Sequence, residues 1–241
     1  MSELFLTTGL MLVCSVVMGR LMFLIDGTGW INNISRKLMA VIPWDFEEIK
    51  ASAIGIWYYI APAIFTVFFC IAFDHNLLHY LKLELKYIPY IPITILAQMS
   101  VMTMMSGCLT VFSPNKDWAG EIGNISWIKS IQKRNKAVVP LVPVLGAFVE
   151  ETFFRGTVFL ILYTDFEQLG FVGAFLISGF MFTIEQLLFT GNRSQFLSML
   201  LGSLGLSFVA CASVAYTGSF LPCLLAHECF LVFYFGKFKY Y

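Results

Sequence analysis

Long apolar runs dominate the chain, and polar stretches interrupt them at intervals. A helix needs about 20 apolar residues to cross the hydrocarbon core of a bilayer. Seven runs approach or exceed that length, at residues 4–24, 53–73, 89–112, 137–163, 169–190, 196–215 and 219–236. The pattern predicts an all-α, polytopic transmembrane bundle of about seven spans, formed by residues 1–241 as one integral membrane domain.

The composition supports a membrane environment. Of the 241 residues, 59% are hydrophobic and only 12% are charged. A soluble domain carries about 25% charged residues, because water must solvate its surface. Much of this surface therefore faces lipid. The formal net charge is zero, which gives no reason to expect a nucleic-acid partner.

The distribution of basic residues predicts how the chain is oriented. The polar stretch 113–136 holds five Lys or Arg residues, and cytoplasmic loops carry an excess of such residues. Counting spans from a cytoplasmic 113–136 loop places the N-terminus outside and the C-terminus in the cytoplasm. The polar stretch 25–52 then lies on the cytoplasmic side, and its segment 43–48 is expected to form an interfacial helix.

One span carries an unusual charge content. Residues 137–163 include Glu150, Glu151 and Arg155, and each charge at the bilayer centre costs at least about 2.5–3.5 kcal/mol on insertion scales. Glu151 and Arg155 are four residues apart, so they share a helix face and can neutralise each other. Glu150 points about 100° away from that face. It is left as a candidate general acid or base, or else as part of a polar cluster that only stabilises the fold.

The three histidines differ in context. His227 lies in an apolar segment and is followed by Glu228. A zinc-protease motif would need a second histidine four positions later, where the chain has Leu231. His75 and His79 have the spacing of half a metal site, but no third ligand is evident. We therefore expect no metal and no other cofactor.

Three stretches resemble the signatures of the CAAX protease and bacteriocin-processing (Abi) family. The stretch 150–156 is similar to the EExxxR motif of that family. The stretch 178–186 resembles the second motif, with Phe182 in place but Gln186 where the family has histidine. The stretch 217–227 is similar to the third motif, which ends in Ala226-His227, and Leu231 stands where the family usually has asparagine or aspartate. The resemblance covers residues 137–231.

The resemblance implies an intramembrane glutamic protease that works without a metal. Glu150 would activate a water for attack on a peptide carbonyl, and His227 would help stabilise the oxyanion. Glu151 belongs to the same motif and would act with Arg155. Gln186 could orient the water but could not take up a proton. Glu185 or Glu228 could support the site in place of the altered groups.

Three functions remain open. The first is a divergent endopeptidase that cleaves a prenylated C-terminal tail or a small exported peptide precursor. The second is a catalytically silent relative that binds a peptide or lipidated tail as an immunity, chaperone or assembly factor, with a membrane protein as a possible partner. The third is a small-solute transporter, although no paired broken-helix pattern supports it.

Overall fold

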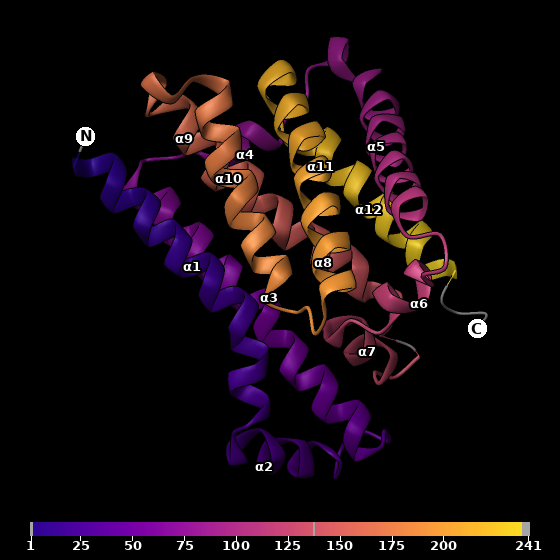
Figure 1. Ribbon diagram of the computed structural model, residues 1–241. Coiled ribbons are helices and arrows are strands. Elements are labelled where there is room, and N and C mark those ends of the chain that lie inside the picture. The colour runs from indigo at the N-terminus through magenta and orange to yellow at the C-terminus, as the bar shows by residue number, and fades with distance from the viewer. Residues whose placement is uncertain (1, 137, 238–241) are drawn as a thin grey trace.

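The computed structural model describes residues 2–136 and 138–237, apart from the side chains of 132 and 234–237. In this part of the chain all regular secondary structure is helical, as predicted (Figure 1). The long helices are α1 (Ser2–Asp26), α3 (Phe46–Ala72), α5 (Tyr90–Phe112), α10 (Gly170–Leu187), α11 (Arg193–Thr217) and α12 (Leu221–Lys237). The shorter ones are α2 (Gly29–Leu38), α4 (Leu77–Leu81), α6 (Trp118–Gly123), α7 (Ser126–Gln132), α8 (Leu141–Phe153) and α9 (Leu160–Thr164).

In the part of the chain that the structure describes, five segments are long and apolar enough to cross a membrane. They are Ser2–Asp26, Phe46–Ala72, Leu85–Phe112, Glu167–Leu187 and Arg193–Thr217. A shorter apolar helix, Leu221–Phe233, follows them. The chain is thus a multi-pass membrane protein. Each of the seven predicted spans contains a helix, but the number seven itself stays a prediction.

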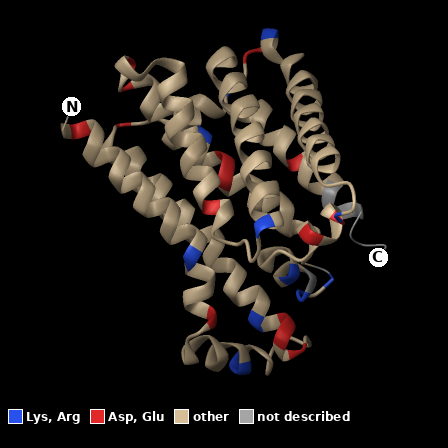
Figure 2. Ribbon diagram, in the orientation of Figure 1, with Lys and Arg blue, Asp and Glu red and all other residues tan. Residues whose placement is uncertain are grey.

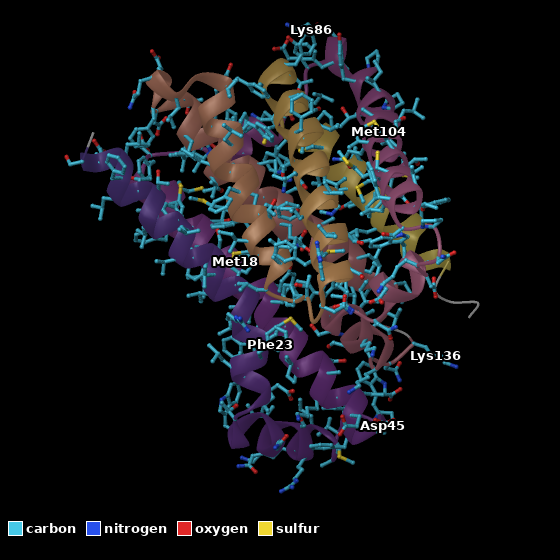
Figure 3. All side chains as sticks on the ribbon, in the orientation of Figure 1. Met18, Phe23, Asp45, Lys86, Met104 and Lys136 are labelled. Carbon is cyan, nitrogen blue, oxygen red and sulfur yellow. The ribbon has the colours of Figure 1, made fainter. Side chains whose placement is uncertain are left out.

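The helices form a bundle around α8 and its continuation. Helix α1 packs against α3 and α10, α10 packs against α11, and α5 packs against both α11 and α12. Most charged residues lie toward the ends of the bundle, and a few lie at mid-height (Figure 2). Asp45 and Lys136 lie at one end and Lys86 at the other (Figure 3). The polar loops around residues 45 and 136 therefore share one end of the bundle.

The polar stretch 25–52 differs from the prediction. The short helix of this stretch is α2, whereas residues 46–48 form the first turn of α3. Asp45 is instead the N-cap of α3: its side chain accepts a hydrogen bond from the Glu48 amide at 2.8 Å, and the Glu48 carboxylate accepts one from the Asp45 amide at 3.3 Å. This reciprocal capping box satisfies two amides that would otherwise lack partners. The acidic residues Asp45 and Glu48 therefore act as the N-terminal cap of α3.

The predicted span 137–163 is not one regular helix, and its first residue lies outside the described residues. Helix α8 ends at Phe153, a π-helical turn follows at Phe154–Phe159, and α9 continues the direction. The hydroxyl of Thr157 donates to the carbonyl of Thr152 five residues earlier, at 3.0 Å. Such π turns are frequent at functional sites because they change which side chains face inward. This turn begins three residues after Glu151.

Small residues allow α11 to approach its neighbours closely. Gly205 on α11 faces α5, and a β-carbon placed there would lie 2.5 Å from Val101 Cγ1. Small residues at helix contacts are common in membrane proteins, because lipid provides no hydrophobic force to press helices together and close packing must do so. Gly205 therefore sets the distance between α5 and α11.

We predict that Gly205→Leu destabilises the protein by about 1–3 kcal/mol, the usual cost of overpacking. The matched control is Gly107→Leu on α5, where an added β-carbon meets no atom within 4 Å. Thermal unfolding in detergent micelles measures both variants. Equal melting temperatures for Gly205→Leu and the wild type would contradict this account of the α5–α11 contact.

Candidate active site

Glu151 and Arg155 form the buried ion pair that their spacing predicts. Arg155 Nε lies 3.3 Å from Glu151 Oε2, and each side chain is only 1% exposed. The guanidinium also donates to Ser207 Oγ on α11 at 2.9 Å. Its carbon Cζ lies 4.3 Å from the centre of the Phe182 ring, which adds a cation–π contact. These contacts compensate a charge that would otherwise be costly to bury.

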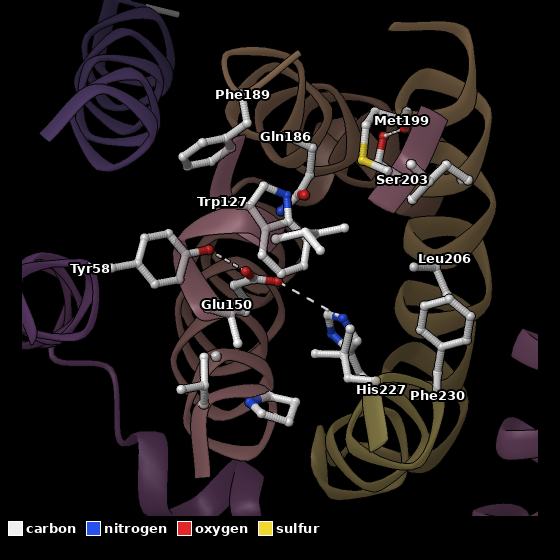
Figure 4. Close-up of a pocket in the computed structure, with 18 of the residues that line it drawn as sticks. Tyr58, Trp127, Glu150, Gln186, Phe189, Met199, Ser203, Leu206, His227 and Phe230 are labelled. Carbon is white, nitrogen blue, oxygen red and sulfur yellow. Dashed lines mark hydrogen bonds and ion pairs between the residues drawn. The ribbon is translucent and has the colours of Figure 1, made fainter. Parts of the chain in front are cut away.

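His227 connects the ion pair to Glu150. Its Nδ1 lies 2.7 Å from Glu151 Oε1, and its Nε2 lies 3.9 Å from Glu150 Oε2. Because a carboxylate can only accept, Nδ1 carries the proton in the contact with ionised Glu151. The ring is therefore fixed, and Nε2 is turned toward Glu150 (Figure 4).

The Thr-Gly-Ser turn of the third motif positions His227. Gly218 ends α11 with φ of +66°, a left-handed conformation that glycine adopts without strain. The Thr217 hydroxyl lies 2.7 Å from the Ser213 carbonyl and 3.0 Å from the Ser219 carbonyl, and its one proton can be donated to either of them. Ser219 Oγ then accepts a hydrogen bond from the Leu221 amide at 3.2 Å, at the start of α12. The motif thereby fixes the direction in which α12 leaves the turn.

Tyr58 on α3 is a site residue that the sequence did not reveal. Its hydroxyl hydrogen-bonds to Glu150 Oε1 and lies 3.2 Å from Glu185 Oε1. A hydroxyl carries one proton, so it can donate to only one of the two carboxyl groups. When it donates to Glu150, the contact with Glu185 is a hydrogen bond only if Glu185 is protonated and donates in turn. Tyr58 lies far from both acids in sequence, and no spacing rule could identify it.

In the second motif, the Gln186 amide binds a neighbouring acid, whereas the resemblance led us to expect that it would orient the water. Gln186 lines the same cavity as Glu150, but its amide nitrogen donates to Glu185 Oε2 at 2.7 Å. Glu185 is completely buried and is held by Gln186 and Tyr58. Phe182 packs its ring against Arg155 and stands edge-on to the His227 ring, with centroids 6.4 Å apart. Phe182 thus supports the two charged groups through packing.

A cavity opens in front of Glu150 and His227. It has an empty volume of about 1060 Å³, its open mouth included. Figure 4 shows Tyr58, Gln186 and Trp127 around the Glu150 carboxylate, with Leu206 and Phe230 beyond His227. Most lining residues are apolar, and Leu231 is one of them. This mainly apolar lining, with a few polar groups converging on one end, is typical of a ligand site.

Two groups of candidate residues lie away from this cavity. Glu228 is partly buried and does not line the cavity. The supporting role expected for it is therefore not explained by a contact with the site. His75 is buried, lies 2.8 Å from the Gly156 carbonyl through Nε2, and stacks on Tyr80. Over the described ranges, no group of three His, Cys, Asp or Glu side chains could hold a metal ion.

Comparison with known proteins identifies the segment that carries the site. Residues 134–232 match the family model described as type II CAAX prenyl endopeptidase Rce1-like. No curated protein and no solved structure matches the chain. The match contains Glu150, Glu151, Arg155 and His227, whereas Tyr58 lies outside it. The resemblance to the CAAX protease (Abi) family that was inferred from the three motifs is thus confirmed over residues 134–232.

Proposed function

We propose that the protein is an intramembrane endopeptidase that uses Glu150 and His227 to hydrolyse a membrane-associated or exported peptide. One observation carries the proposal: the Glu150 carboxylate and His227 Nε2 face each other 3.9 Å apart on an open cavity. Hydrogen-bond reaches of about 3 Å from each group overlap in front of them. A water and a substrate carbonyl can both be placed there.

Glu150 acts on the water. Its carboxylate accepts a proton as the water oxygen bonds to the carbonyl carbon, and the carbonyl oxygen becomes an oxyanion. The protonated carboxyl then donates to the leaving nitrogen as the C–N bond breaks. Tyr58 occupies one Glu150 oxygen, which leaves Oε2 for the water. General acid–base catalysis of this kind contributes about 10²–10⁴-fold to a rate.

His227 acts on the oxyanion. When the ring carries both protons, both nitrogens donate. Nδ1–H then stays on the Glu151 carboxylate, and Nε2–H can donate to the oxyanion. One such donor is worth about 3 kcal/mol in the transition state. Arg155 keeps Glu151 ionised for this role, because it pairs with Oε2.

Orientation in the membrane is part of the proposal. We place the end of the bundle that carries Asp45 and Lys136 in the cytoplasm, with the N-terminus outside and the C-terminus inside. The basic 113–136 loop supports this choice. The tip of the chain, residues 238–241, lies outside the described residues.

Replacement of Glu150 by Gln should abolish cleavage of a fluorogenic farnesylated peptide in proteoliposomes, with a loss of about 10²–10⁴-fold. Glu228→Gln is the matched control, since Glu228 does not line the cavity and the exchange removes the same charge. Cleavage at the wild-type rate by Glu150→Gln would refute the catalytic role. A wild type that binds the peptide without cleaving it would support the silent relative, and solute flux instead would support a transporter.

Removal of the Tyr58 hydroxyl should lower kcat while KM changes little. A hydrogen bond to a charged group is worth about 1.5–3 kcal/mol, or roughly a 10- to 150-fold change. Tyr58→Phe is compared with Tyr90→Phe, which loses a hydroxyl contact of 3.0 Å with Tyr216; neither of these two tyrosines lines the cavity. A shifted pH–rate profile in Tyr58→Phe alone would separate an effect on Glu150 from a general loss of packing. Identical kinetics in both variants would argue against positioning by Tyr58.

Single cysteines placed at Lys136 and at Lys86 should react with an impermeant maleimide from opposite faces of the membrane. The background carries Cys108→Ser and Cys229→Ser, which remove the two exposed native thiols. In intact cells only the cysteine at position 86 is expected to react, and both should react after permeabilisation. Labelling of position 136 in intact cells would reverse the proposed orientation.

A further inference from the structure

Arg134 places a second cation in the wall of the site cavity. It lies between α7 and α8, lines the same cavity as Glu150 and His227, and is only 6% exposed. Helix α3 leaves room for it through Gly55, where an added β-carbon would lie 2.1 Å from Arg134 Nη2. The helix surface is therefore shaped around the guanidinium.

This guanidinium has too few partners for a buried charge. Its Nη1 donates to the Tyr59 hydroxyl at 3.2 Å, whereas its Nε is buried and has no hydrogen-bond partner. Over residues 2–136 and 138–237, none of the observed ion pairs includes Arg134. The nearby acid Glu48 is instead bound by Asn135 and by the Asp45 amide. A buried cation without a counter-charge is costly, so the surroundings of Arg134 favour an anionic ligand.

Two neighbouring tyrosines connect Arg134 to the hydrolytic centre. Arg134 contacts Tyr59, and the neighbouring Tyr58 contacts Glu150. The two tyrosine rings are 5.9 Å apart, nearly edge to face. An extended peptide advances about 3.3 Å per residue. A few residues are thus enough to connect a carbonyl at Glu150 with a group at Arg134.

We propose that Arg134 binds the α-carboxylate of the substrate's C-terminal residue, so that Glu150 attacks a bond only a few residues from the chain end. The inference rests on the proposed function. A guanidinium presents a planar set of donors that matches a carboxylate in a bidentate contact. Apolar side chains between the two ends, among them Ile131 and Val142, can contact the intervening residues of the peptide.

The test compares a farnesylated peptide that ends in a free carboxylate with the same peptide ending in an amide. For the wild type, kcat/KM should be about 10- to 100-fold higher for the acid, because one charge-assisted bidentate contact is lost with the amide. In Arg134→Gln this preference should disappear, mainly through KM for the acid, and Arg134→Lys should keep part of it. Lys133→Gln, which removes an exposed neighbouring cation, should retain the full preference.

Binding to the Glu150→Gln variant, followed by fluorescence anisotropy, separates the two proposals. If the wild type cleaves neither peptide but this variant binds the acid more tightly than the amide, the proposed function fails and the carboxylate site stands. If Glu150→Gln, which keeps Arg134, binds the acid and the amide with equal affinity, the carboxylate site is overturned, whether or not the wild type cleaves either peptide. If Arg134→Gln weakens both peptides equally, and only in vesicles that contain phosphatidylglycerol, the bound anion is a lipid headgroup and the proposal is overturned.

Discussion

The ion pair between Glu151 and Arg155 is the constraint on which the site depends. Both side chains are almost completely buried, Glu151 in the last turn of α8 and Arg155 in the π turn that follows. An isolated charge at such an apolar position would be expelled or neutralised. Their contacts reach Ser207 on α11, Phe182 on α10 and His227 on α12. One pair of opposite charges thereby fixes three helices around α8. The packing of the bundle and the geometry of the site are consequences of the same interaction.

This arrangement explains why two adjacent glutamates have different roles. Glu151 has one oxygen beside Arg155 and the other on His227, so it can neither reach the cavity nor exchange a proton there. Glu150 lies on another face of the same helix and has a hydroxyl and an imidazole as neighbours instead of a cation of its own. The guanidinium therefore anchors one acid and leaves the other available for chemistry. The order Glu-Glu-x-x-x-Arg encodes this division through helix geometry alone.

The helical fold, the Glu151–Arg155 contact and the family of residues 134–232 could be predicted from sequence, because each depends on local spacing or on a motif. Tyr58 and Arg134 could not. Tyr58 reaches Glu150 across 92 positions of the chain, and only tertiary packing brings them together. Arg134 resembled one more basic residue of a cytoplasmic loop, because loop composition does not indicate which cation is buried. The π turn was also hidden, because a π turn and an α-helix of the same apolar composition give the same hydropathy pattern.

The second motif has Gln186 in place of histidine, and the hydrogen bonds around Tyr58 offer a reason for this exchange. Glu150 and Glu185 both contact the Tyr58 hydroxyl, which supplies a single proton. Two ionised carboxylates on one hydroxyl would repel each other in a low dielectric, so the group is stable when one of the acids carries a proton. The Gln186 amide donates to Glu185, whereas a charged histidine ring there would bring a further titrating proton. The neutral Gln186 donor therefore holds Glu185 without adding a titrating group of its own. The departure from the family pattern is thus matched by a neighbouring acid that the pattern does not include.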